Sequence, residues 1–577
     1  MNKILKYGIA LIFGAILSVS CDEGKFLEEK PLDFYTPVNS LEKSTEFQAA
    51  INFLHNRVRH IIWGGIDLDA NFALRYATDF AVNATDYSPA VKLNDYKNTM
   101  VPTFSVPKNI WEPNYTIISN ANVIIDRAKI STTLSDIEKK SFTAQALFFR
   151  ALSYRMLANL FGGVPLILEE VINPRRDYVR ATREAVYQQC KTDLLESIDG
   201  LDDIDKVKDG KINKQVAKHL LAEIYISLNM PDEAITTASE VISYPAVGIM
   251  TNRFGRTKDK PGDVFRDLFE LNNQNRLSGN KEGLYVIQAD YLNLASTQRD
   301  VMQWALIPNM GSLTIKSSVG GVVKSVPAIL GYNDKLSGRG VGWMRPTSHF
   351  LYTIWKDDFY GDIRNSKYNI IRDFQIDGVA STSPDYGKWY VADGYAKKTT
   401  SFADTIRNWF PIIKKASLSQ GDFPAEYFKK DASGSPIVSP LGGNILVNAS
   451  ENVFKDQYLF RLAETYLLRA EAFIMKGDKQ KAADDLNVLR ARAKTIPVNA
   501  SNVNIDYLLD ERLRELYGEE LRMVTLTRMG KLYDRDVKYN EKSGLSIQPY
   551  HNLWPIPFSE IERNIESKME QNPGYTN

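Results

Sequence analysis

Apolar side chains recur at helical spacing from about residue 38 to residue 244. The clearest predicted helix follows Ser135, which is placed to form a capping box with Glu138. Its apolar stripe comprises Ala144, Leu147, Phe148, Ala151, Tyr154 and Ala158. We expect the helix to end at Gly162 and Gly163, because glycine accepts left-handed backbone and Pro165 cannot continue a helix.

The chain contains an internal repeat. Residues 222–238 align without a gap with residues 470–486, and each copy reads as a helix, a short turn and a second helix. Alanines in the second helix allow the two backbones to approach closely, as in tetratricopeptide hairpins. Degenerate copies are predicted around residues 111–128 and 144–161. Because such repeats cannot bury their apolar faces alone, we expect them to stack into one continuous core.

The middle of the chain has a different pattern. Residues 245–452 are rich in Gly, Ser, Asn, Asp and aromatic residues and lack long periodic runs, which predicts loops, short strands and isolated helices. Helical periodicity returns at Leu459. We therefore predict a mainly α fold with a single domain from residue 41 to 577, in which a helical-hairpin scaffold (41–244 and 453–577) holds an irregular, loop-rich lobe with short strands.

The N-terminus has the pattern of a targeting segment. Two lysines precede an apolar run at residues 7–17, which is too short to span a bilayer. Small residues then lead to Cys21, so residues 1–20 resemble a lipoprotein signal peptide, with Cys21 lipidated and 21–40 acting as a tether. The other cysteine, Cys190, lies on a helical stripe and is expected to be a small buried residue.

Composition narrows the functional classes. Charged residues make up 24% of the 577 residues, which is too polar for a protein with many membrane spans. Lys and Arg number 71 against 70 Asp and Glu, so no strong positive field favours nucleic acid, and no nucleic-acid partner is predicted. The 29 Tyr, 26 Phe and eight Trp residues provide flat faces for core packing or for stacking on sugar rings.

Motifs for catalysis, metals and cofactors are weak. The five histidines lack metal-ligand spacing, so neither a metal site nor a cofactor is predicted. The adjacent acids Asp357-Asp358, Asp484-Asp485 and Glu519-Glu520 lie in helical patterns, where neighbouring side chains diverge, and they read as solvated faces. The glycine-rich residues 338–342 lack the strand-to-helix context of a phosphate site and are interpreted as a flexible ligand loop.

Several motifs in one order resemble the SusD/RagB family. They are FLEEKP at 26–31, Trp111, NAN at 120–122, residues 146–154 with FGGVPL at 161–166, RLAETYLLRAEA at 461–472, LN at 486–487, RARA at 490–493, residues 511–530, LWPIP at 553–557 and QNPGY at 571–575. The middle is matched mainly by Gly342-Trp343 and by Asp362-Ile363-Arg364. Residues 523–525 depart from the family pattern, which usually carries an aromatic and an acid there.

This resemblance implies a lipid-anchored protein of the outer membrane, exposed at the cell surface, that captures a glycan or a peptide. It implies a SusC-like TonB-dependent transporter as the partner. The family fold packs about four tetratricopeptide-like units against the irregular lobe, and the ligand binds on that lobe. The resemblance implies no enzymatic activity.

Glycan capture needs aromatic planes for sugar rings and polar groups for hydroxyls. The resemblance implies Trp343 as a ligand aromatic, and Arg345 is close enough in sequence to donate to hydroxyls. Asn83 and Tyr87 follow a Thr-Asp pair that resembles a second contact loop, and Trp304 and Tyr291 would contribute a third. Trp63, Trp111 and Trp554 lie in or beside structural motifs and are assigned to packing.

Two other functions remain open from the sequence. A surface glycosidase would need two carboxylates facing each other across a cleft about 5 to 10 Å apart. A repeat scaffold would bind only protein partners and no small ligand.

Overall fold

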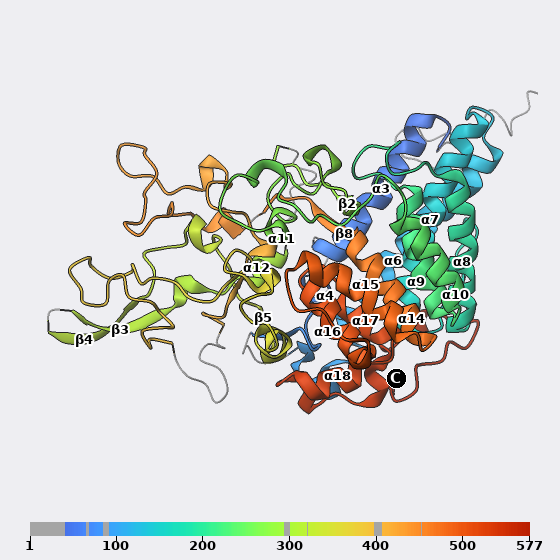
Figure 1. The fold of residues 1–577 in the computed structure, drawn as a ribbon. Coiled ribbons are helices and arrows are strands. Elements are labelled where there is room, and N and C mark those ends of the chain that lie inside the picture. The colour runs from blue at the N-terminus through green and yellow to red at the C-terminus, as the bar shows by residue number, and fades with distance from the viewer. Residues whose placement is uncertain are drawn as a thin grey trace, which may run out of the picture.

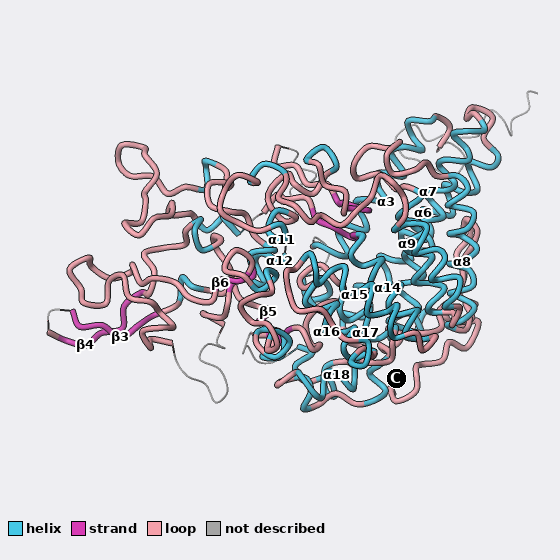
Figure 2. The backbone as a smooth tube through the Cα atoms, viewed as in Figure 1, coloured by secondary structure: helices cyan, strands magenta, loops and turns pink. Residues whose placement is uncertain are grey.

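The computed structural model describes residues 41–64, 68–84, 92–292, 301–319, 321–396, 407–451 and 453–576. Helices fill one side of the molecule, and loops with short strands form the other side (Figures 1 and 2). The predicted signal peptide at 1–20, the tether at 21–40 and Cys21 lie outside these residues. None of the helices described is both long and apolar enough to cross a membrane.

The helices of the scaffold come from both ends of the chain. They are α3 (Ser44–Trp63), α4 (Leu68–Ala73), α5 (Tyr96–Thr99), α6 (Ser105–Ile130), α7 (Asp136–Phe161), α8 (Arg183–Gly200), α9 (Lys214–Ser227), α10 (Pro231–Ile242), α14 (Leu462–Met475), α15 (Lys479–Arg492), α16 (Ile505–Leu516), α17 (Arg522–Arg528), α18 (Leu532–Tyr539) and α19 (Phe558–Arg563). The helices from α6 to α10 pack in sequence order, and α14 then continues the stack by packing against α10. The predicted tetratricopeptide-like scaffold is confirmed.

The two plain copies of the repeat form the hairpins α9–α10 and α14–α15, which lie side by side because α10 packs against α14. Asn229 and Gly477, which the repeat aligns, both have positive φ, 57° and 78°, at the turn between their helices. Asparagine and glycine tolerate this backbone best. Residues 111–128 and 144–161 each fall inside a single helix, so together they form one hairpin, α6–α7, and not two further copies.

The predicted limits of α7 are confirmed. The Ser135 side chain accepts from the backbone N–H of Glu138, and the Glu138 carboxylate accepts from the N–H of Ser135. Gly162, with φ of 74°, follows the last helical residue. The helix is buried on nearly all sides over residues 146–161, since α6 and α8 cover it.

The lobe contains only short elements. Its helices are α11 (Val264–Asp267), α12 (Val301–Leu306) and α13 (Ser348–Leu351), and its strands are β2 (Gly283–Ile287), β3 (Thr314–Val319), β4 (Val322–Pro327), β5 (Met344–Pro346), β6 (Ile370–Ile371) and β7 (Ile412–Ile413). The strands pair antiparallel in two-stranded sheets, β3 with β4 and β6 with β7. Two lobe strands instead pair with scaffold segments, β5 with β1 (Ala81–Asn83) and β2 with β8 (Gln457–Arg461), and so join the lobe to the scaffold.

Burial confirms several packing assignments. Cys190 is fully buried and donates to the Ala151 carbonyl, and Trp63, Trp111 and Trp554 are at most 4% exposed. The assignment of Glu519-Glu520 to a solvated helix face is wrong, because both residues lie in the turn between α16 and α17. Their side chains form buried ion pairs with arginines. Among the described residues, no group of three or more His, Cys, Asp or Glu is arranged to hold a metal.

Candidate functional site

Two of the predicted ligand aromatics lie in contact. The rings of Trp304, in α12, and Trp343, just before β5, have centroids 4.4 Å apart, and Phe72 of α4 meets Trp343 edge-on at 5.8 Å. Trp304 is 9% exposed and Phe72 3% exposed, whereas Trp343 is only partly buried at the edge of the core. Trp343 is therefore the member of this aromatic cluster that offers a face outside the core.

Backbone contacts bring the two tryptophans together. The N–H groups of Val341 and Gly342 donate to the Trp304 carbonyl at 2.8 and 3.3 Å. A Cβ at Gly340 would lie 2.1 Å from the Ile307 carbonyl oxygen. Gly342 has φ of 65°, and a Cβ there would lie 2.4 Å from the Arg407 carbonyl oxygen. These glycines are needed for close backbone approach, so the predicted flexible loop is a packed connection that fixes Trp343 against α12.

The strands β1 and β5 set the position of Trp343 from the other side. Asn83 pairs with Met344 across these strands, and the Ala84 N–H donates to the Trp343 carbonyl at 2.9 Å. The side-chain amide of Asn94 bonds both the N–H and the C=O of Asn83, at 3.0 and 2.7 Å. Asn83 is 7% exposed, so the structure brings it beside Trp343 mainly as backbone support.

The Arg345 side chain has a partner within the chain. Its guanidinium donates to the Glu541 carboxylate at 2.6 Å, and it is 6% exposed. Glu541 is more than a third exposed, so this ion pair lies at the surface end of a mostly buried arginine. Arg345 is next to Trp343 in sequence, but its charged group is committed to a residue of the C-terminal segment.

A buried carboxylate holds the start of β1. The Arg522 guanidinium donates two hydrogen bonds to Asp79, at 2.8 and 2.7 Å, and Arg535 donates a third at 2.8 Å. Burial alone would raise the pKa of Asp79, but the charges of Arg522 and Arg535 hold it well below its usual range. The Asp79 carbonyl also accepts from the Thr347 hydroxyl, just after β5. Asp79 thus connects α17 and α18 to the two strands beside Trp343.

Two predicted contacts lie elsewhere. Tyr291 packs against Phe454 at 4.9 Å and Tyr427 at 6.3 Å, in a separate apolar cluster from Trp304 and Trp343. Tyr87 lies outside the described residues. Of the six predicted ligand residues, the structure therefore brings together Trp343, Trp304 and Asn83, with Arg345 next in the strand.

Sequence reasoning missed Phe72, since nothing in its spacing links α4 to residues 304 and 343. It also missed the charge network behind the site. Arg461 pairs with Glu282, Glu515 and Glu519, and Arg492 pairs with Glu282 and Glu515. Each of these side chains is at most 9% exposed. These charges satisfy one another in the interior, so they act as support and do not face a ligand.

Comparison with known proteins places this architecture in a family. The model of the SusD family matches residues 448–575, and a second model, described as starch-binding associating with outer membrane, matches residues 25–226. SusD-like protein P2 of Formosa agariphila is 26% identical over 588 residues, covering 99% of this chain and all of that protein. The starch-binding protein SusD of Bacteroides thetaiotaomicron is 41% identical over 121 residues, about a fifth of each chain.

Solved structures share the fold along nearly the whole chain. A laminarin-binding SusD-like protein superposes with a TM-score of 0.63 at 20% identity, covering 93% of this chain and 100% of the other. A SusD superfamily protein from Parabacteroides distasonis gives a TM-score of 0.64 at 18% identity with the same coverage. At this level of identity the likeness establishes the fold.

Proposed function

The chain belongs to the SusD family, and from that premise we propose that it is a cell-surface binding protein for an oligosaccharide, with its ligand on the aromatic cluster of Trp304 and Trp343. The single observation that carries the proposal is the contact of these two rings, which come from separate segments of the lobe and leave Trp343 partly exposed. Sugar rings stack on such faces, because their C–H surfaces are apolar while their hydroxyls stay hydrated.

The wider role extends the same proposal. Lipid on Cys21 would anchor the protein to the outer membrane at the cell surface, and a SusC-like TonB-dependent transporter would receive the ligand. The ligand would stabilise the closed arrangement of the two proteins by contacts made only in that arrangement. A peptide ligand is the alternative within this role. Mass spectrometry of Cys21 in the native protein and co-purification with the transporter test these two steps.

Binding is tested by titrating purified protein with a panel of α- and β-linked oligosaccharides. We expect at least one to bind without turnover and Trp343→Ala to weaken it about tenfold, which corresponds to ~1.4 kcal/mol. Trp389→Ala is the matched control, because Trp389 is 46% exposed in the lobe and is outside the aromatic cluster. Equal losses in both variants would contradict the proposed site.

The same panel separates the other functions. Shortened products in the reaction mixture would favour a glycosidase. A stable protein partner with no glycan or peptide binding would favour a repeat scaffold. The buried, arginine-paired state of Glu519 and Glu520 argues against this pair as an acid and nucleophile, since neither carboxylate faces a cleft.

A further inference from the structure

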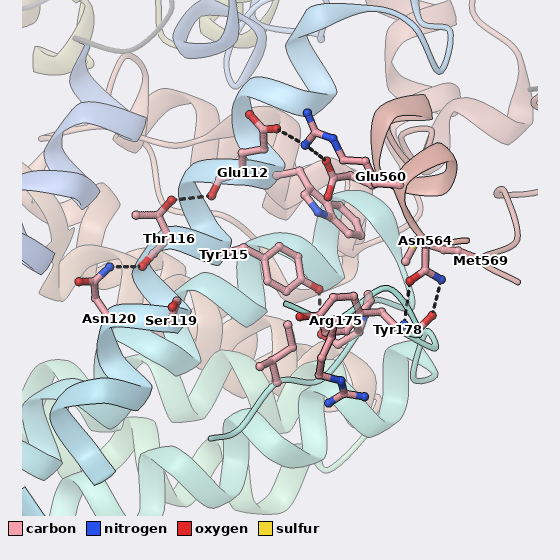
Figure 3. A pocket seen from close by; sticks show the side chains of 14 residues that line it. Glu112, Tyr115, Thr116, Ser119, Asn120, Arg175, Tyr178, Glu560, Asn564 and Met569 are labelled. Atoms are coloured by element: carbon pink, nitrogen blue, oxygen red, sulfur yellow. Dashed lines mark hydrogen bonds and ion pairs between the residues drawn. The ribbon is translucent and has the colours of Figure 1, made fainter. Parts of the chain in front are cut away.

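A concave site lies on the scaffold and shares no residue with the aromatic cluster of Trp304 and Trp343. It is a groove of about 530 Å³ along one face of α6, closed on its other sides by residues 165–178 and by residues 560–569 (Figure 3). We call it the α6 groove. Tyr115 lies near its middle, with Arg175 and Tyr178 close to the ring, and Ser119 and Asn120 lie further along α6 (Figure 3). The volume is typical of small-ligand sites.

The groove is built by residues fixed before any ligand arrives. The Tyr115 hydroxyl donates to the Pro165 carbonyl at 2.8 Å. The Asn564 side chain bonds both the N–H and the C=O of Tyr178, at 2.7 and 2.8 Å. The three segments are therefore held together by hydrogen bonds that do not use the rings of Tyr115 and Tyr178. A site held in place in this way loses little entropy when a ligand binds.

Polar groups remain available along the same face. The Asn120 amide donates to the Thr116 carbonyl at 2.8 Å, and its side-chain carbonyl accepts no hydrogen bond from the described part of the chain. The Ser119 hydroxyl is exposed and has no partner among the described residues. From Trp111 to Asn120 the helix rises ~14 Å, which suits a short chain of rings better than a single one.

The charges of the groove are already paired. Arg175 donates to Asp177 at 2.9 and 3.1 Å, and Arg563 lies 3.4 Å from both Glu112 and Glu560. A charged ligand would have to displace these partners, whereas a neutral, hydroxyl-rich ligand would not. The Arg175 guanidinium lies over the Tyr178 ring, 5.2 Å from its centroid. Aromatic rings beside hydroxyl and amide groups are the chemistry that binds neutral sugars.

We propose that the α6 groove is a second binding site, for a neutral oligosaccharide. The proposal rests on the proposed function only in the class of ligand, since the two sites have separate residues. Two sites on one chain would hold a long glycan more tightly than either alone, provided that the glycan spans both.

The test uses the full mature chain and a panel of neutral gluco-, xylo-, manno- and galacto-oligosaccharides, with stoichiometry measured by calorimetry. Tyr178→Ala removes a ring whose backbone hydrogen bonds to Asn564 remain. Ser119→Trp fills the groove from an exposed position on α6. Tyr360→Ala is the matched control, because Tyr360 is 95% exposed in the lobe and outside both sites.

We expect the wild type and Tyr360→Ala to bind two molecules of the oligosaccharide. Both groove variants should weaken one binding event by at least about tenfold and leave the other unchanged. Trp343→Ala should do the reverse. Because the variants act on different sites, a variant that merely unfolds would lose both events together, and its melting curve would show it.

The outcomes separate the two proposals. If Trp343→Ala abolishes all binding and the groove variants bind like the wild type, the α6 groove proposal is overturned and the proposed function stands. If only the groove variants lose binding, the groove is supported and the Trp343 site fails. If the groove variants lose a protein partner but no glycan, the groove is a protein-docking surface and the proposal is overturned. If no member of the panel binds, both proposals fail.

Discussion

Removing the charge of Asp79 should destabilise the protein strongly. The side chain is fully buried and receives three hydrogen bonds from Arg522 and Arg535. In Asp79→Asn the two guanidinium groups keep their other acids, which are Glu520 for Arg522 and Asp506 and Asp510 for Arg535. Removing one charged partner of a buried ion pair lowers the free energy of unfolding by about 3–5 kcal/mol, since the remaining charge stays desolvated.

The expected change in melting temperature follows from chain length. An unfolding entropy of about 2.1 cal/mol/K per residue over ~540 residues gives ~1.1 kcal/mol/K, so Asp79→Asn should lower Tm by about 3–4 °C. Differential scanning calorimetry at pH 7 measures it. Asp357→Asn is the control, because Asp357 is exposed in the lobe, and its Tm should change by less than about 0.5 °C.

The same variant makes a prediction about pH. The pKa of Asp79 is lowered in the folded protein, so the carboxylate stabilises the fold above its unfolded pKa of about 3.9 and this stabilisation is lost as the pH falls. The difference in Tm between wild type and Asp79→Asn should therefore shrink from pH 7 to pH 3. A Tm within 1 °C of the wild type at pH 7, or a difference that grows in acid, would refute the reasoning.

Three further predictions follow from buried groups. Burial lowers the pKa of His219 to about 3, so the imidazole is protonated between pH 6.5 and 5 only in the unfolded chain. Acidification from pH 7 to 5 should therefore lower the free energy of unfolding by about 2 kcal/mol, or Tm by ~2 °C. His219→Gln should not show this loss. Burial also raises the pKa of the Cys190 thiol, so a thiol reagent should label it only after unfolding; labelling of the native protein would contradict its packing. A double-mutant cycle of Trp304→Ala and Trp343→Ala, read by Tm, should give a coupling of about 0.5–1.5 kcal/mol; purely additive effects would mean that the two rings do not stabilise each other.

The scaffold could be predicted because its helices and turns are determined by residues close together in the sequence. The apolar stripe and caps of α7 are set by residues within one helix, and the turns at Asn229 and Gly477 need a residue type that tolerates positive φ. The alignment of the two repeat copies also predicted similar hairpins. Periodicity does not reveal that α10 packs against α14, because about 220 residues separate them in the chain.

The candidate site could be predicted only in part, because its partners are distant in sequence. Glu541, the partner of Arg345, is 196 residues away, so an arginine that looked available for hydroxyls is already paired. The sequence predicts a solvated Glu519, because its partners Arg461 and Lys415 come from other segments and cannot be inferred from spacing. Residue propensities and the spacing of apolar residues predict where a helix or a turn forms. The environment of a charged side chain depends instead on tertiary contacts.

The buried charges also explain how the lobe is held in a fixed position. Arg461 and Arg492 of the scaffold share Glu282 of the lobe and Glu515 of α16, and Arg364 of the lobe also reaches Glu515; every one of these side chains is fully buried. Each carboxylate here balances two or more arginines, so changing any one residue leaves a desolvated charge and is costly. Other buried ion pairs, such as Arg266 with Glu270, lie within the lobe itself. The lobe is therefore attached to the scaffold by buried charges, and the aromatic cluster of Trp304 and Trp343 that would bind a ligand is separate from them.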